Sequence, residues 1–335
     1  MGEFDLIDRF FRRAGRLGGG VALGIGDDCA LLQPRPGMQM ALSSDMLVRG
    51  RHFFPDVDPR TLGHKALAVN LSDLAACGAR PLAFTLALAL PEINESWLDG
   101  FSQGLFALAD EHACELVGGD TTQGPLNICI TVFGEIPVTD GKSLALLRSG
   151  ARPGDDLYVS GTLGDARLAL DALRGDIQVQ PDDLARLRLR LEQPTPRVAL
   201  GLALRGIASS AIDVSDGLVG DLGHILKASG VGALIDVPNA MYLIADSPLF
   251  SRACAMNDQI PPAERQLACV LAGGDDYELA FTAPPDARAE VRAAALSSKT
   301  SVTRIGHIDA TGLLKLRHAT GQVTTPNYAG FDHFR

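Results

Sequence analysis

The sequence predicts a two-domain fold of layered α/β (α+β) type, and three observations lead to this expectation. The chain has 335 residues, about twice the length of a common domain. Apolar residues make up 46% of it and charged residues 21%, so ordinary packed cores are expected. Short apolar runs alternate with segments of helical periodicity in both halves, as in folds that layer helices on a sheet.

The boundary between the two domains is expected near residue 140. The segment 139–156, TDGKSLALLRSGARPGDD, changes to a composition rich in glycine and charge. We therefore expect one domain over residues 1–140 and a second over residues 141–335.

The first half is expected to begin with an amphipathic helix over residues 4–14. Asp58 followed by Pro59 is typical of a helix start, so a helix is expected over residues 59–78. The remaining elements are a strand over 38–45 that ends at Asp45, a buried strand over 82–90, an amphipathic helix over 96–113, and strands over 115–119 and 127–136.

The second half repeats the alternation of strands and helices. Residues 176–196 are interpreted as a surface excursion, and the sequence does not decide whether residues 175–196 order on ligand binding. Strands are expected over 157–161, 211–216, 233–237, 273–283 and 302–308, and helices over 163–173, 197–208, 217–230 and 286–298.

Charge and composition narrow the possible partners. The net charge is −10, which disfavours a nucleic-acid partner because such partners require a basic surface. No apolar run is long enough to cross a bilayer, and the N-terminus is acidic rather than signal-like, so no membrane partner is expected. Six cysteines lie scattered without a C-x-x-C pair, which is typical of reduced thiols in a cytoplasmic protein.

Aspartates recur in short polar motifs along the whole chain. Two unit charges about 4 Å apart repel by roughly 1 kcal/mol in water and by more near a protein surface, unless a cation lies between them. Mg²⁺ prefers a few carboxylates together with phosphate oxygens, so the motifs predict a magnesium-phosphate site. A turn role for any single motif is the alternative. The metal-ligand candidates from this reasoning are Asp28, Asp45, Asp73, Asp120, Asp213 and Asp216.

Asp73 is the sharpest of these candidates. It lies inside a predicted helix, on the same face as Asn70 and among apolar neighbours, so its carboxylate must be paired or coordinated. Asp213 and Asp216 flank Ser215 at a strand-to-helix junction, where backbone N–H groups can hold a phosphate. Helix capping is the alternative for Asp216.

Several familiar phosphate and hydrolase motifs are missing. The chain contains no GxxxxGK[ST] loop, no GxSxG, no HExxH and no kinase-type HRD or DFG. Phosphoryl transfer by this chain would therefore use an unrelated scaffold rich in carboxylates.

In order along nearly the whole chain, the motifs resemble those of the thiamine-monophosphate kinase family, in the superfamily of aminoimidazole ribonucleotide synthetase-like enzymes. The segments that carry the resemblance are GIGDDCALL, SSDMLVRGRHF, HKALAVNLSDLAACGARP, GGDTTQGPL, RSGARPGDDLYVSGTLGDA, SAIDVSDGLVGDLGHI, GGDDYELAFT and the tail NYAGFDHF. The resemblance implies phosphorylation of thiamine monophosphate by ATP through direct in-line transfer, several Mg²⁺ ions, and a homodimer in which the N-terminal domains pair.

The resemblance also implies roles for individual residues. Those expected to take metal and phosphate oxygens are Asp28, Ser43, Ser44, Asp45, Asp73, Asp120, Asp213 and Asp216. Those expected at ATP are Gly119, Asp120, Arg148 and Ser215, and those expected at thiamine monophosphate are His52, Asp275 and Tyr328. The residues expected to act in catalysis are Asp28, Asp120, Arg148 and Asp216.

Two positions depart from the family pattern. Asp275 stands where the family commonly has glutamate, and Tyr328 where it often has tryptophan, so both departures fall on the expected substrate contacts and not on the metal set. Two alternatives stay open: another ATP-using enzyme of the same superfamily, and a non-catalytic sensor of nucleotide or metal.

Overall fold

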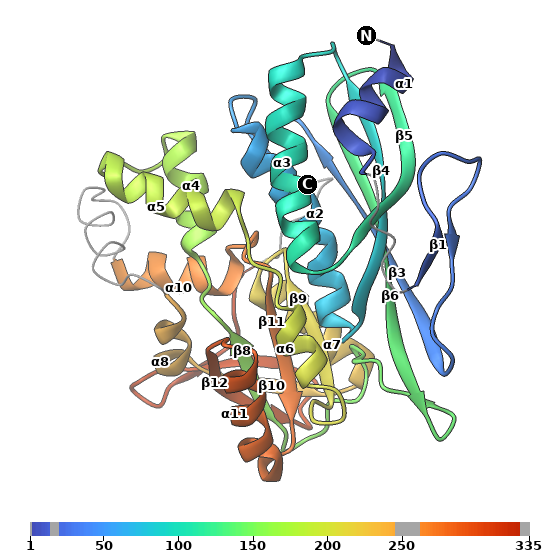
Figure 1. The fold of residues 1–335 in the computed structure, drawn as a ribbon. Coiled ribbons are helices and arrows are strands. Elements are labelled where there is room, and N and C mark those ends of the chain that lie inside the picture. The colour runs from blue at the N-terminus through green and yellow to red at the C-terminus, as the bar shows by residue number, and fades with distance from the viewer. Residues whose placement is uncertain (1, 14–19, 245–261, 329–335) are drawn as a thin grey trace. The chain divides into compact units, whose positions relative to one another are not determined.

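The computed structural model describes residues 2–13, 20–244 and 262–328. The chain separates into two compact units (Figure 1). The N-terminal unit consists of Met1–Leu74 with Ala79–Ala145, and the C-terminal unit consists of Leu146–Arg335 with the short piece Ala75–Gly78. Cys254 lies outside the described residues. So do residues 329–335, which belong to the tail motif.

The N-terminal unit is built on a mixed sheet. Its strand order is β3-β6-β4-β5, and the short strand β7 (Lys142–Ser143) pairs with β6. The main strands are β3 (Met38–Val48), β4 (Arg80–Leu90), β5 (Glu115–Gln123) and β6 (Asn127–Thr139). A separate ribbon of β1 (Val21–Leu23) and β2 (Leu31–Leu32) packs through Val21 on Leu82 and Val117.

Two long helices cover this sheet on one face and lie side by side (Figure 1). They are α2 (Pro59–Ala76), whose start is capped by Asp58 through the Arg60 amide at 2.7 Å, and α3 (Glu95–Glu111). A Cβ atom at Gly63 would lie 2.0 Å from the Phe101 carbonyl oxygen, and one at Gly104 would lie 1.8 Å from the Arg60 carbonyl oxygen. Only glycine permits this backbone approach.

Three expected boundaries in this unit are corrected. The first helix, α1 (Glu3–Leu6) continued by the π-helix η1 (Ile7–Phe11), ends before residue 14. Strand β3 continues to Val48, so Asp45 lies within a strand. Strand β5 continues to Gln123, so Asp120 does not follow a strand but belongs to one. Both strands are longer because ladder pairing with β6 and β4 continues past the aspartates.

The C-terminal unit is built on a seven-stranded sheet with the order β14-β13-β10-β12-β8-β11-β9. Neighbouring strands are antiparallel, except that β10 and β13 are parallel. Every residue of β8, β9 and β11 is buried. The strands are β8 (Asp156–Ser160), β9 (Ser210–Val214), β10 (Gly232–Asp236), β11 (Glu278–Ala283), β12 (Val302–Asp309), β13 (Leu314–Arg317) and β14 (Val323–Thr324).

The helices of this unit include one where a surface excursion was expected. Residues 176–196 contain α5 (Pro181–Glu192), because Leu187 and Leu191, one turn apart, bury one face of it. The others are α4 (Asp165–Arg174), α6 (Val198–Ala203), α7 (Leu218–Ser229), α8 (Val237–Ala240), η2 (Met241–Leu243), α10 (Pro262–Ala272), η3 (Pro285–Ala287) and α11 (Arg288–Ser297).

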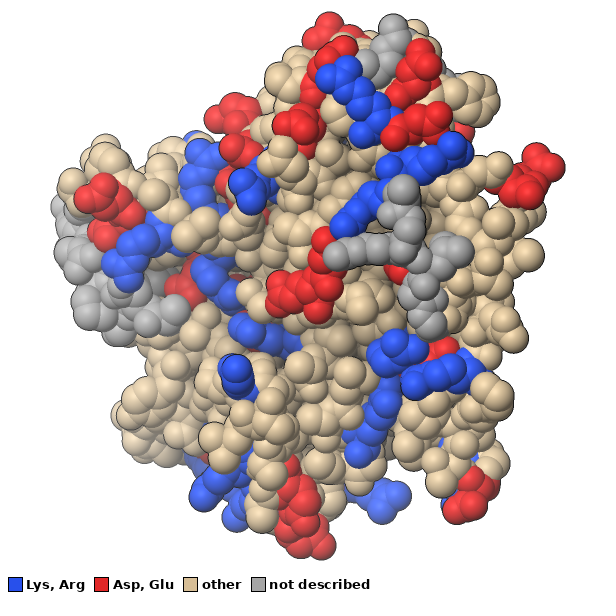
Figure 2. All heavy atoms as spheres, viewed as in Figure 1, with Lys and Arg blue, Asp and Glu red and all other residues tan. Residues whose placement is uncertain are grey.

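Within the described ranges, the helices lack the combination of length and apolar character that a membrane span requires. On the face drawn in Figure 2, acidic and basic side chains are interspersed. Exposed ion pairs of the protein include Arg9 with Glu95 at 2.8 Å and Arg13 with Asp110 at 2.8 Å.

Candidate functional site

In the N-terminal unit, strand β3 and helix α2 bring four predicted polar residues together. The Ser43 hydroxyl donates to a carboxylate oxygen of Asp73 at 2.5 Å. One turn earlier on α2, the Asn70 side-chain oxygen accepts from the Asp45 amide at 3.1 Å. Asn70 and Asp73 therefore share the helix face that contacts β3, and the carboxylate of Asp73 is paired, both as predicted.

Ser44 lies on the opposite face of β3 from Ser43, because side chains alternate along a strand. Its hydroxyl is 2.9 Å from the Thr131 hydroxyl and bonds to the Ile130 carbonyl oxygen at 3.2 Å. The sheet therefore places Ser43 and Ser44 in different surroundings within this unit.

Gly119 and Asp120 lie on β5, at the other edge of the sheet. Asp120 pairs with Ala87 of β4, and Gly119 pairs with Leu86. Gly119 has φ of 146°, and a Cβ atom there would lie 1.8 Å from the Leu86 carbonyl oxygen, so the position requires glycine. Two strands separate β5 from β3, and three strand spacings amount to roughly 14 Å, so the sheet does not bring Asp120 beside Asp45.

Asp28 and His52 lie in turns of the same unit. Asp28 is exposed, and its amide donates to the side chain of Asp27 at 2.9 Å. The His52 ring accepts from the Val48 amide through Nδ1 at 3.0 Å, which orients the imidazole in the turn after β3.

Oxygen ligands are available in this unit, although protein groups alone do not complete a metal site. Among the described residues, no group of three or more His, Cys, Asp or Glu side chains lies close enough to hold an ion. Ser43 and Asp73 present hard oxygen atoms 2.5 Å apart. Such donors suit Mg²⁺, which commonly takes one or two carboxylates and completes its shell with phosphate oxygens and water.

In the C-terminal unit, the end of β9 meets the loop that precedes β11. Asp213 is a buried residue of β9, and Ser215 and Asp216 follow the strand. The Asp275 amide donates to the Ser215 carbonyl oxygen at 2.8 Å, and the Tyr277 amide donates to that of Val214, also at 2.8 Å. A backbone hydrogen bond therefore joins Ser215, which is predicted to contact the nucleotide, to Asp275, which is predicted to contact the substrate.

The expected phosphate-binding amides at this junction are already engaged. The amides of Ser215 and Asp216 both donate to one carboxylate oxygen of Asp221, each at 3.1 Å. We therefore correct the expectation that these two N–H groups hold a phosphate. Helix α7 begins only at Leu218, so the intervening turn needs an acceptor for them.

Asp221 was missed at the sequence level. Burial and the negative charge of Asp216 together raise the pKa of its carboxyl to about 7, although the backbone amides of Asp216, Ser215 and Gly217 act to lower it. The only sequence pattern that could have indicated Asp221 is an aspartate in the first turn of a predicted helix, a common and unspecific feature.

The loop before β11 is conformationally unusual. Asp275 has φ of 59° and Tyr277 has φ of 51°, both in the left-handed region that side chains other than glycine rarely adopt. Asp276 between them is 2% exposed and accepts from the Gly164 amide at 3.1 Å. Burial raises the pKa of the Asp276 carboxyl well above its ordinary value. Such conformations persist where surrounding contacts enforce them, often at functional sites.

Arg148 and Tyr328 lie elsewhere in the C-terminal unit. The Leu147 carbonyl oxygen accepts a hydrogen bond from the Ala211 amide near the start of β9, which places the neighbouring Arg148 backbone beside that end of the strand. Ser215 follows Ala211 by four residues, so the Arg148 backbone is roughly 13 Å from Ser215. Arg148 is exposed, and its carbonyl oxygen accepts from the Ser229 hydroxyl at 3.2 Å. Tyr328 is half-buried, and burial together with the charge of Glu264 raises the pKa of its phenol.

Comparisons with known proteins place both units in one family. Residues 26–136 match the model of the N-terminal domain of AIR synthase related proteins, and residues 152–319 match the model of their C-terminal domain. The chain is 46% identical to the thiamine-monophosphate kinase of Salmonella typhimurium over 336 residues, covering 99% of this chain and 98% of that relative.

Solved structures agree with this relationship. The crystal structure of thiamine-monophosphate kinase from Stenotrophomonas maltophilia has a TM-score of 0.80 and 44% identity, covering 94% of this chain and 96% of that one. The structure of AaThiL complexed with AMPPCP and TMP has a TM-score of 0.75 and 29% identity, covering 90% of this chain and 89% of that one.

Proposed function

Since the chain belongs to the thiamine-monophosphate kinases of the AIR synthase related family, we propose that it uses ATP to convert thiamine monophosphate to thiamine diphosphate. The observation that carries the proposal is 46% identity across 99% of the chain to a protein of that activity. A solved relative that is complexed with AMPPCP and TMP supports binding of two substrates, a nucleotide and thiamine monophosphate.

The chemistry requires little acid–base catalysis. A phosphate oxygen of thiamine monophosphate attacks the γ-phosphorus of ATP in line, the bond from that phosphorus to the ADP oxygen breaks, and the products are ADP and thiamine diphosphate. The acceptor oxygen is already ionised near neutral pH, so no strong base is needed. Positioning and neutralisation of charge are therefore the main tasks of the protein.

We assign Mg²⁺ as the cation of this site. When bound, Mg²⁺ would supply positive charge that offsets repulsion between the two anions. On β3 and α2, Ser43, Asp45 and Asp73 would hold it, because the Ser43–Asp73 contact already brings two oxygen ligands together. The remaining proposed ligands are Asp28, Ser44, Asp120, Asp213 and Asp216.

The other predicted residues receive roles in the same proposal. Gly119, Asp120, Arg148 and Ser215 would contact ATP, and the guanidinium of Arg148 suits phosphate geometry. Of the set, Asp28, Asp120, Arg148 and Asp216 would act at the transferring phosphoryl group.

Thiamine monophosphate carries both a cation and an anion. Asp275 would favour its thiazolium by charge, and the ring face of Tyr328 would do so by cation–π attraction. His52 would lie at its phosphate.

We also propose a homodimer formed by the N-terminal units and a cytoplasmic location. Strand β3 is an edge strand that exposes Leu42 at 61% and Met46 at 52%. These side chains lie four residues apart on the same face, so a second copy would remove both from water. The cysteines, none in a C-x-x-C pair, suit a reducing compartment.

A turnover assay tests the function directly. The purified full chain is incubated with ATP, Mg²⁺ and thiamine monophosphate, and thiamine diphosphate is measured by chromatography. We expect one thiamine diphosphate for each ADP formed, with thiamine itself not phosphorylated. Binding of both ligands without product would support a non-catalytic sensor instead, and product with another acceptor alone would support a different enzyme of the superfamily.

A further inference from the structure

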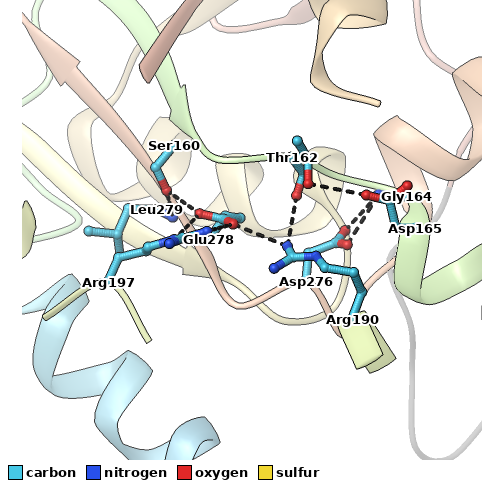
Figure 3. A network of polar contacts seen from close by, with 9 residues as sticks. All are labelled: Ser160, Thr162, Gly164, Asp165, Arg190, Arg197, Asp276, Glu278 and Leu279. Carbon is cyan, nitrogen blue, oxygen red and sulfur yellow. Dashed lines mark hydrogen bonds and ion pairs between the residues drawn. The ribbon is translucent and has the colours of Figure 1, made fainter. Parts of the chain in front are cut away.

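A buried carboxylate at the first residue of β11 is held by two arginines and a serine (Figure 3). The side chain of Glu278 is 0% exposed. Arg197 donates to it with a two-pronged guanidinium, Nε to Oε2 at 2.6 Å and Nη2 to Oε1 at 2.5 Å. Arg190 of α5 adds a bond at 3.1 Å and the Ser160 hydroxyl one at 2.6 Å.

The surrounding backbone is shaped for this carboxylate. Gly161 has φ of 54°, and a Cβ atom there would lie 2.0 Å from Oε1 of Glu278, so any other residue would collide with the acid. The Ser160 hydroxyl also accepts from the Leu279 amide at 2.8 Å. A buried charge persists only where it is paired and hydrogen-bonded, and Glu278 meets both conditions.

Glu278 directly follows the loop that carries Asp275. Glu278 is three positions after Asp275 in the sequence, and Asp275 and Tyr277 both have left-handed backbones. The loop is joined to Ser215 and Val214 by two backbone hydrogen bonds of 2.8 Å. Asp276, which lies in the same loop, accepts from the Gly164 amide at 3.1 Å. Contacts of α5 and of the 160–164 segment therefore enforce the loop conformation.

We propose that Glu278 is a positioning residue for thiamine monophosphate: clamped by Arg190, Arg197 and Ser160, it holds the loop so that Asp275 meets the substrate. Glu278 is wholly buried and does not itself touch substrate. This inference rests on the proposed function. It also gives α5 a role, since Arg190 ties that helix to the substrate loop.

The test compares two buried carboxylates of the same unit. Glu278→Gln keeps the size of the side chain and removes its charge. Asp156→Asn is the matched control, because Asp156 is 3% exposed and is also held by two arginines, Arg288 at 2.6 Å and Arg304 at 3.0 Å. Asp156 is at the opposite end of β8 from Ser160, away from the loop.

We expect both variants to lower the melting temperature, but only Glu278→Gln to alter the kinetics. At a temperature well below both melting transitions, its KM for thiamine monophosphate should rise on the order of 10-fold to 100-fold, as for a misplaced binding group. The KM for ATP should change far less. Equal kinetic constants in the two variants would overturn the inference.

A double-mutant cycle separates positioning from general destabilisation. If Glu278 acts through Asp275, then Glu278→Gln should raise this KM much less in an Asp275→Asn background than in the wild-type chain. The proposal would be contradicted if the two substitutions raised this KM independently, so that the double variant showed the product of the two single effects.

Two further measurements keep the outcomes distinct. Should Glu278→Gln fail to fold, Arg197→Lys retains the charge while losing the two-pronged contact, and it should raise the same KM to a smaller extent. A wild-type chain that makes no thiamine diphosphate would refute the proposed function. A wild-type chain with normal turnover, beside an Arg197→Lys variant of unchanged KM, would refute the positioning role alone.

Discussion

At the scale of single residues, the contact between Ser43 and Asp73 explains why an acid lies in an apolar helix. Asp73 is half-buried on α2, where an unpaired carboxylate would be costly. The Ser43 hydroxyl supplies a donor, and the Asp45 amide is held nearby by Asn70. One carboxylate oxygen is thereby oriented towards β3, which places it where a cation would join strand and helix.

Asp73→Asn tests the metal-ligand role. We expect turnover to fall on the order of 100-fold or more, because an amide cannot replace a charged ligand at a phosphoryl-transfer site. The melting temperature should change little, because the amide oxygen still accepts from Ser43. The measurements are kcat over a range of Mg²⁺ concentrations and a thermal melt.

Asp99→Asn serves as the control for this variant. Asp99 is exposed on α3 and accepts from Gln103, so its replacement should leave kcat unchanged. A near-wild-type rate for Asp73→Asn at every Mg²⁺ concentration would remove Asp73 from the ligand set.

At the scale of elements, β6 is joined to its surroundings by a buried acid. Glu135 is 0% exposed and accepts from Arg35 at 2.9 Å and from Arg80 of β4 at 2.9 Å. Burial alone would raise the pKa of the Glu135 carboxyl, but the donors of Arg35 and Arg80 outweigh it, and the pKa is lowered. The interaction therefore stabilises the sheet only while the carboxylate is charged.

This shift predicts the pH dependence of stability. The pKa of Glu135 is lower in the folded state than the unfolded value of about 4.3. The ion pair therefore contributes to the free energy of unfolding above that pH, and this contribution is lost as the pH falls through the folded-state pKa. Glu135→Gln should therefore lower the urea midpoint at pH 7 and make its decline below about pH 4.3 shallower.

Urea unfolding from pH 3 to pH 7 measures the effect, with the exposed Glu92→Gln as control. Parallel acid limbs in wild type and Glu135→Gln would show that this ion pair does not contribute to acid sensitivity.

At the scale of the whole molecule, the proposed dimer depends on an apolar face that strand β3 leaves exposed. Leu42 and Met46 lie on the opposite face of β3 from Ser43, whose side chain contacts α2, so their exposure follows from the pleat. Replacing both by arginine should shift the chain from dimer to monomer at micromolar concentration, because burying two charges at an interface is costly.

Light scattering after size-exclusion chromatography measures the mass. The control is Leu296→Arg, since Leu296 is 74% exposed on α11 of the other unit and should leave the mass unchanged. A wild-type monomer, or a Leu42→Arg/Met46→Arg chain that stays dimeric, would exclude this surface as the interface.

Local patterns predicted most helices and strands, because they depend on residues close in sequence. Asp58 and Pro59 marked the start of α2, and the apolar run over 82–90 marked β4. The ends of β3 and β5 were missed, because a strand ends where its partners stop pairing and not where its own composition changes. Helix α5 was missed as an element, although its leucines have helical spacing.

The sequence by itself determined the family, most of the elements and the candidate acids, since these are carried by residue types in short motifs. Only the tertiary structure decided which of them meet. In the tertiary structure Ser43 contacts Asp73, and Asp275 contacts Ser215. The amides of Ser215 and Asp216 donate to Asp221. Glu278 is bound by Arg190 and Arg197. These contacts join residues from different elements, and their geometry depends on strand register and helix packing, which no local pattern encodes.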